Sequence, residues 1–370
     1  MRSDGGKTLI RKMLLVAILA TAGIGAAPAA AAPEDAVGRE MAATATINDP
    51  KMQELAKRAI GDVEKLAAKG DPKALTFMGL SYQMGLGVAK DRAKADAWFA
   101  KGAAANEPIA EFNYGLAVHD GRVGPKDPAA AIGWWRKAAA QGNVESTAML
   151  GLAYFSGDGV AADRAQAIKL LTDAASHKNA QALAMLGAVY LNGWGAPADP
   201  PRGLSMLKDA ADLGSPTAMF QIGIAYSTGK PFPKDPVAAR RWFANAAALN
   251  LPDAQVGLGL MMMGGLGGDK DETKAVELFT KAAEAKNADA MLFLSKAYAT
   301  GTGVPADPQK SNRYLYEAAL GGNAIACFAV GRKAESEGNL KIAEDLYALA
   351  AAKGYAPAKE ALDRLKARKP

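Results

Sequence analysis

The chain has 370 residues, of which 50% are apolar and 7% aromatic, a composition typical of tightly packed helices and not of a disordered chain. Its formal net charge is +6, but basic and acidic residues are interspersed, which argues against the clustered basic face that nucleic-acid binding needs. Cys327 is the only cysteine, so an intramolecular disulfide and a thiolate metal cluster are both excluded. The fold must be held together by packing, and we expect no metal and no other cofactor.

The N-terminal residues 1–31 have the three parts of a secretory signal peptide. A basic stretch precedes the apolar run Met13–Ile24, and small residues follow at positions 25–32. Cleavage is predicted after Ala31, because Pro33 would hinder a cut one residue later. The alternative is an uncleaved signal that anchors the chain in the inner membrane, although the apolar run is short for a membrane span. We therefore expect an exported protein, periplasmic or secreted.

Two short segments follow before the main body of the chain. Residues 32–50 are expected to form a flexible lead after cleavage. Residues 51–70 are predicted to form a single capping helix that ends at Gly70, because glycine tolerates the left-handed backbone that often ends a helix.

A glycine recurs every 36 residues through most of the remaining chain. The series is Gly79, Gly115, Gly151, Gly187, Gly223 and Gly259, and it is continued by Ser295 and Gly331. Alanine or serine lies five positions before each member. Self-similarity at such a fixed period is the signature of a repeat architecture. The sequence predicts an all-α fold, an α/α solenoid of eight repeats over residues 71–356.

Each repeat is predicted to contain two helices. Proline opens the first helix in several repeats, for example Pro72, because its missing N–H costs nothing at that position. A glycine such as Gly85 ends this helix in the left-handed conformation. An aspartate starts the second helix of seven repeats, where its carboxylate can accept hydrogen bonds from the first turn: Asp91, Asp127, Asp163, Asp199, Asp235, Asp271 and Asp307. Residues 357–370 are predicted to form a closing helix.

The repeating glycine falls in the interior of the first helix, where it costs roughly 1 kcal/mol relative to alanine. Such a cost in every repeat needs a compensating gain. We therefore expect another helix to pass over each glycine too closely for a side chain. The small residue five positions earlier fits the same close packing. Repeats of this size must stack on their neighbours to bury their apolar faces.

The combined pattern resembles the Sel1-like repeat family, a relative of the tetratricopeptide repeat. The motif A-x-x-x-L-G-x-x-Y-x-x-G-x-G-V-x-x-D is matched best by residues 74–99 and 146–171. The resemblance covers residues 70–356 and implies a right-handed superhelix of antiparallel helix pairs. It also implies a role as adaptor, scaffold or regulator, often in the bacterial envelope. The chain departs from the family in its altered turns at residues 121–124 and 229–231, and it lacks the cysteines with which some secreted members staple each repeat.

The sequence contains no recognisable catalytic constellation. His119 and His177 are the only histidines, and both are interpreted as surface or capping residues. Most aspartates repeat in every unit, so they are interpreted as helix caps. Glu111 is the one acidic residue expected on an inner face, and a single carboxylate lacks the partner that glycoside hydrolysis uses. A non-catalytic function is favoured, with an enzyme acting on cell-wall material or a related small molecule as the alternative.

The expected partner is another protein or a peptide, such as the periplasmic domain of an envelope or membrane protein. On the first helices, the positions two and four before the glycine are apolar and methionine-rich in the middle repeats, and methionine suits adaptable binding surfaces. Two interpretations are open: these residues line a groove, or they fill gaps between helices. A turn tryptophan at an unconstrained position would suit an interface anchor, or would pack on the next loop. The predicted binding residues are Met149, Leu183, Met185, Met219, Met291 and Trp194.

Overall fold

The computed structural model describes residues 49–367, which form helices joined by turns and contain no strand. The predicted signal peptide and the lead up to residue 48 lie outside the described residues. Within the described part of the chain, no helix combines the length and the apolar character needed to cross a membrane.

Eight helix pairs follow a single N-terminal helix, α3 (Pro50–Ala67). The first helices of the pairs are α4 (Pro72–Met84), α6 (Pro108–His119), α8 (Val144–Ser156), α10 (Ala180–Asn192), α12 (Pro216–Thr228), α14 (Pro252–Gly264), α16 (Ala288–Thr300) and α18 (Ala324–Ser336). The second helices are α5 (Arg92–Ala104), α7 (Pro128–Ala140), α9 (Arg164–Ser176), α11 (Pro200–Asp212), α13 (Pro236–Ala248), α15 (Glu272–Glu284), α17 (Pro308–Leu320) and α19 (Leu340–Ala352). A last helix, α20 (Ala356–Ala367), follows. The prediction of an all-helical fold with a repeat of 36 residues is confirmed.

The ends of the helices follow the local rules read from the sequence. Each of the seven repeating aspartates accepts a hydrogen bond from a backbone N–H of the first turn, as Asp127 does from Ala130 at 2.9 Å. The glycines that end the first helices of seven pairs have φ between 63° and 77°. After the second helices, Lys178 and Lys286 take the same left-handed conformation at φ of 58° and 66°, although their side chains disfavour it.

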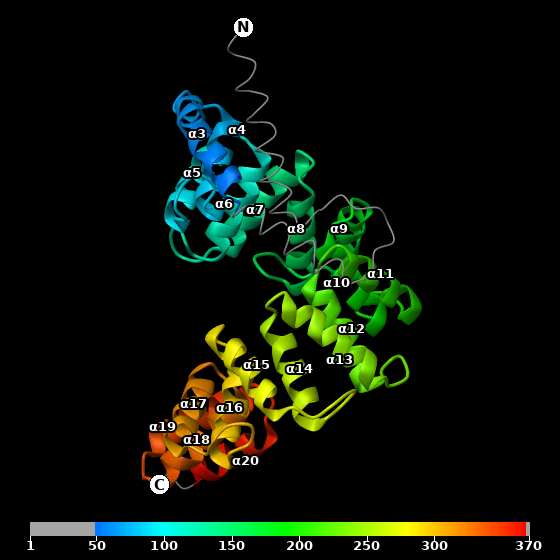
Figure 1. Ribbon diagram of the computed structural model, residues 1–370, viewed down its shortest axis with the longest axis vertical. Coiled ribbons are helices and arrows are strands. Elements are labelled where there is room, and N and C mark those ends of the chain that lie inside the picture. The colour runs from blue at the N-terminus through cyan, green and yellow to red at the C-terminus, as the bar shows by residue number, and fades with distance from the viewer. Residues whose placement is uncertain (1–48, 368–370) are drawn as a thin grey trace. The chain divides into compact units, whose positions relative to one another are not determined.

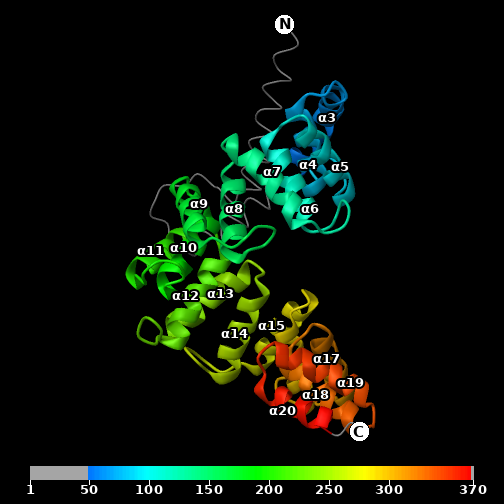
Figure 2. The same ribbon diagram turned by 180° about the vertical axis from the view of Figure 1, so that it is seen from behind.

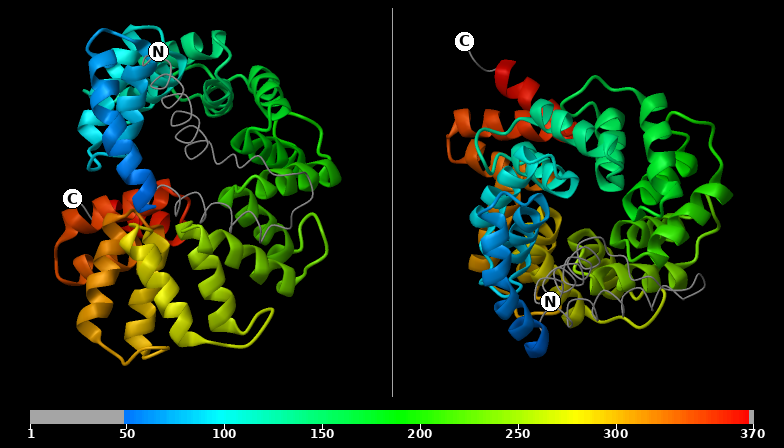
Figure 3. Two further views of the ribbon diagram at one scale, coloured as in Figure 1. Left: turned by 45° about the horizontal axis from the view of Figure 1, so that its top comes forward. Right: turned by 90° about the horizontal axis from the view of Figure 1, so that it is seen from above.

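The helices divide into two compact units, with the boundary between Ala218 and Met219. In the first unit, each helix from α3 to α11 packs on the next (Figure 1), and the first helices of neighbouring pairs also touch, α4 with α6 and α8 with α10. In the second unit, each helix from α13 to α20 packs on the next (Figures 2 and 3). The described part of each unit is thus built by stacking helices in chain order.

The repeating glycine makes room for a large side chain from the second helix of its own pair. A Cβ built at Gly151 would lie 2.7 Å from Leu171 Cγ, and one at Gly79 would lie 2.5 Å from the Phe99 ring. The expected close approach of another helix is confirmed at the repeating glycines. What fills the space is a side chain: Phe99, Trp135, Leu171, Leu207, Phe243, Phe279 and Tyr347.

A second glycine, in the turn between the two helices, joins one repeat to the repeat before it. A Cβ at Gly159 would lie 2.5 Å from the carbonyl carbon of Pro128, at the start of α7. Gly87, Gly267 and Gly303 approach the backbone of α3, α13 and α15 in the same way, and Gly195 approaches the Arg164 side chain on α9. These turns therefore rest directly on the preceding repeat, where any side chain would force them apart.

Candidate partner-binding site

Three of the six predicted binding residues have enclosed side chains. Met219 is fully buried, Met291 is 6% exposed and Leu183 is 8% exposed. A side chain enclosed to this degree offers no surface to a partner. This burial corrects the groove interpretation at these three positions, where the side chains fill space between helices.

Met149 and Met185 lie between the core and the surface. Each is partly buried and packs against a core cluster, Met149 beside Ile132 and Trp135 and Met185 beside Leu171 and Leu186. Their sulfur-containing side chains contribute to packing in the first unit. A role in binding stays a prediction for both.

Trp194 is exposed, as expected from its variable position in the turn after α10. Its side chain is 44% exposed, and its ring centroid lies 6.4 Å from that of Phe155 at the end of α8. The guanidinium carbon of Arg164 lies 5.4 Å from the centroid of the same Phe155 ring. We call these three side chains, Trp194, Phe155 and Arg164, the aromatic platform.

The aromatic platform repeats a contact that the preceding repeat makes with charges. Trp194 and Asp158 occupy the same position in successive turns, and Phe155 and His119 occupy the same position in successive first helices, 36 residues apart in each case. Asp158 Oδ2 lies 2.8 Å from His119 Nε2. The turn residue thus reaches back to the first helix of the preceding repeat in both places, once through an ionic contact and once through a contact between tilted rings.

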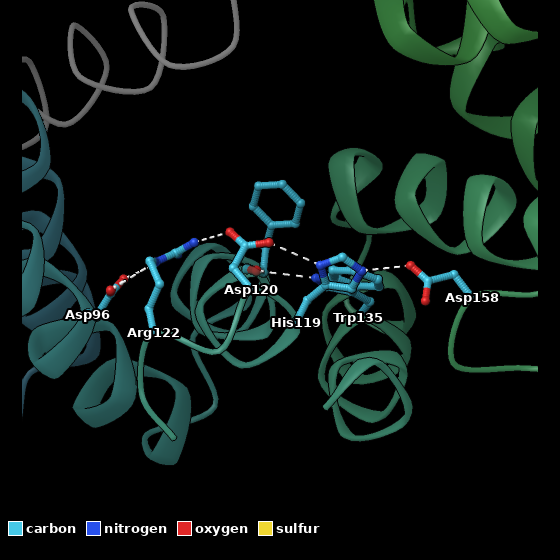
Figure 4. Close-up of polar contacts among 7 residues, drawn as sticks. Asp96, His119, Asp120, Arg122, Trp135 and Asp158 are labelled. Carbon is cyan, nitrogen blue, oxygen red and sulfur yellow. Dashed lines mark hydrogen bonds and ion pairs between the residues drawn. The ribbon is translucent and has the colours of Figure 1, made fainter. Parts of the chain in front are cut away.

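Around His119 the charges form a continuous network (Figure 4). His119 Nδ1 lies 3.0 Å from Asp120 Oδ1, and the imidazole lies over Trp135 with 5.6 Å between ring centroids. Arg122 contacts Asp120 and also donates from Nε to Asp96 Oδ2 at 3.0 Å. We call this set the charged network: Asp96, His119, Asp120, Arg122 and Asp158.

The electrostatics of the charged network favour a protonated histidine. Hydrogen bonds to Asp120 and Asp158 raise the pKa of His119. The hydrogen bond to His119 in turn lowers the pKa of Asp120. Both ring nitrogens face carboxylate oxygens, and only the imidazolium form can donate from both nitrogens at once.

The charged network was not predicted from the sequence, although one signal was present. In the turn at residues 121–124, Val123 stands where five other repeats have the second glycine, so this turn has no glycine to make the close approach described above. Arg122 supplies a different link to the preceding repeat, because it pairs with Asp96 on α5. The absence of this glycine next to an arginine is therefore the sequence signal for a turn that contacts the preceding repeat through an ion pair.

Glu111 lies on α6 and is enclosed. Its Oε2 accepts a hydrogen bond from Gln141 Nε2 at 2.8 Å, and its Oε1 is buried with no hydrogen-bond partner. Burial raises the pKa of its carboxyl group, and Lys137 only partly opposes this shift. A side chain closed off in this way is not positioned to act on a substrate. Among residues 49–367, no group of three or more His, Cys, Asp or Glu side chains could hold a metal ion.

The comparisons with known proteins agree with this architecture. The model of the family described as Sel1 repeat matches seven consecutive segments, residues 72–107, 108–143, 144–179, 180–215, 216–251, 252–287 and 288–323. The crystal structure of a Sel1 repeat protein from Oxalobacter formigenes is similar, with a TM-score of 0.55, 28% identity, and coverage of 70% of this chain and 98% of that one. The protective antigen c5321 of uropathogenic Escherichia coli, which has an SLR fold, gives a TM-score of 0.52 and 27% identity over 84% of this chain and 67% of its own. No curated protein matches the sequence.

Proposed function

The chain belongs to the Sel1 repeat family, and from this premise we propose that it is an exported, non-catalytic adaptor that binds another protein of the bacterial envelope. Sel1 repeat proteins generally mediate protein–protein interactions. The signal pattern over residues 1–31 supports export. The proposed partner is an envelope protein or the periplasmic domain of a membrane protein.

The main observation that supports a binding site at this place is the exposed ring of Trp194. A tryptophan that is 44% exposed is a large apolar group left in water at the tip of a turn. Tryptophan and arginine are enriched among the residues that dominate binding energy at protein interfaces. In the aromatic platform Phe155 supports the Trp194 ring, and Arg164 places a positive charge over the Phe155 ring.

A comparison of variants tests the site. The purified chain and its Trp194→Ala variant are used as bait in envelope extract, and a photo-crosslinking amino acid is placed at position 194. We expect Trp194→Ala to weaken capture about 30-fold or more, as removal of a binding hot spot does. The matched control is Leu320→Ala with the crosslinker at position 320, because Leu320 is 89% exposed and lies in the other unit.

Two results would contradict the binding site. One is equal capture by the parent chain and Trp194→Ala, with circular dichroism showing both folded. The other is a crosslinked partner at position 320 and none at position 194. Export is tested separately by N-terminal sequencing of the protein isolated from cells. A first residue near position 32 supports it, and a chain that still begins at Met1 contradicts it.

A further inference from the structure

His119 joins two successive repeats through a contact that depends on its charge. It is the last residue of α6, and Asp158 lies in the turn after α8, 39 residues further along the chain. Its Nδ1 lies 3.0 Å from Asp120 and its Nε2 lies 2.8 Å from Asp158. A neutral imidazole carries one N–H, so it can donate to only one of these carboxylates.

The charged groups that face His119 come from three places in the fold. Asp120 follows it on the chain, Asp158 faces it from the turn after α8, and Arg122 reaches Asp120 from the turn after α6. From α5, Asp96 holds Arg122, and the charge of Arg92 helps to lower the pKa of Asp120. Trp135 on α7 covers one face of the imidazole ring. The His119 side chain is 21% exposed, so water screens these contacts only partly.

We propose that His119 is a pH-dependent clasp that holds the turn around Asp158 against the end of α6 when protonated and releases it when neutral. Asp120 keeps its contact with Arg122 after His119 loses its proton. Asp158 is held across the repeat boundary by His119, so loss of the imidazolium charge weakens this contact whichever ring nitrogen keeps its hydrogen. The raised pKa of His119 sets the direction: the clasp is closed below the ordinary histidine value near 6.5, and it opens as the pH rises through the higher value in the folded chain.

Release of the clasp would affect the aromatic platform. Phe155 lies in the last turn of α8, three residues before Asp158, and its ring contacts that of Trp194. Movement of the turn therefore changes the support of the exposed ring. This consequence, tighter partner binding at acidic pH, rests on the proposed function, whereas the clasp is a property of the chain alone and can be tested with no partner present.

The test uses the purified chain at a series of pH values from 5 to 9. Histidine ring resonances are followed by NMR, and amide hydrogen exchange is measured at residues 156–161 with correction for the intrinsic effect of pH. We expect the His119 ring to titrate above 6.5 and protection of the turn to fall about tenfold across that titration. In His119→Gln and in Asp158→Asn, protection of the turn should be low at every pH.

The matched control is His177→Gln, because the His177 ring bonds within its own surroundings, to the carbonyl of Asp173 and the hydroxyl of Ser176. This variant should keep the pH-dependent protection of residues 156–161. The proposal is overturned if His119 titrates at or below 6.5, or if protection in His119→Gln still follows pH. The two proposals can be distinguished. Loss of capture by Trp194→Ala concerns the binding site only, and the clasp is tested by the NMR titration and the hydrogen exchange of residues 156–161.

Discussion

Gly151→Ala adds one carbon atom at the closest point between α8 and α9. The new Cβ would lie 2.7 Å from Leu171 Cγ and 3.3 Å from the carbonyl oxygen of Ala167. Either Leu171 leaves its rotamer or the helices move apart, which costs about 1–3 kcal/mol. The better helix propensity of alanine returns about 1 kcal/mol. We expect the variant to be less stable than the parent chain by about 1 kcal/mol.

Gly133→Ala is the matched control, because Gly133 lies inside α7 and a Cβ there would meet no atom within 4 Å. This variant should gain about 1 kcal/mol from helix propensity alone, so the two variants should differ by about 2 kcal/mol. Urea unfolding followed by circular dichroism measures the difference, and amide exchange in α8 and α9 locates it. Repeat proteins can lose stability locally, which makes the second measurement necessary.

A third variant tests the cause. In a Leu171→Ala background the obstructing side chain is gone, so Gly151→Ala should no longer be destabilising. The reasoning is refuted if Gly151→Ala is as stable as Gly133→Ala. It is also refuted if the cost of Gly151→Ala is unchanged when Leu171 is truncated, because the contact with that side chain would then have no energetic weight.

Gly159→Ala combines a φ of 73° with a Cβ only 2.5 Å from the start of α7. At Gly142 φ is 84° but the space is free, so Gly142→Ala should cost only the backbone strain of about 1–2 kcal/mol. The loss of unfolding free energy in urea should therefore be larger for Gly159→Ala than for Gly142→Ala. Arg122→Ala leaves the buried Asp96 carboxylate without its partner and should cost about 2–3 kcal/mol. Adding Asp96→Asn should restore part of that loss, and no recovery would contradict the pairing. His119→Gln should be less stable than the parent chain at pH 5.5, because a raised folded-state pKa stabilises the chain below 6.5, and the difference should shrink by pH 8.5. A difference that grows with pH would have the wrong sign.

The sequence by itself determined the repeat, the helix ends and the need for close packing at the glycines. These features depend on local rules. An aspartate such as Asp127 caps a helix through an N–H three residues away, and a glycine such as Gly85 ends a helix because it tolerates positive φ. Because the pattern recurs every 36 residues, the helices predicted for one repeat are predicted for all of them. Trp194 could also be placed at the surface, since its position varies freely between repeats.

Only the tertiary structure decided which of the apolar side chains on the first helices are covered and which charges meet. The sequence pattern is apolar both two and four positions before the glycine, yet Met219, at the fourth position, is fully buried and Met149, at the second, only partly. Likewise, the repeat places each turn near the preceding first helix, as Trp194 and Phe155 also show, but only the structure shows that Asp158 and His119 meet there. Local patterns describe one helix at a time, whereas burial and ion pairing at a repeat boundary depend on how each pair stacks on its neighbour and on which side chain that neighbour presents.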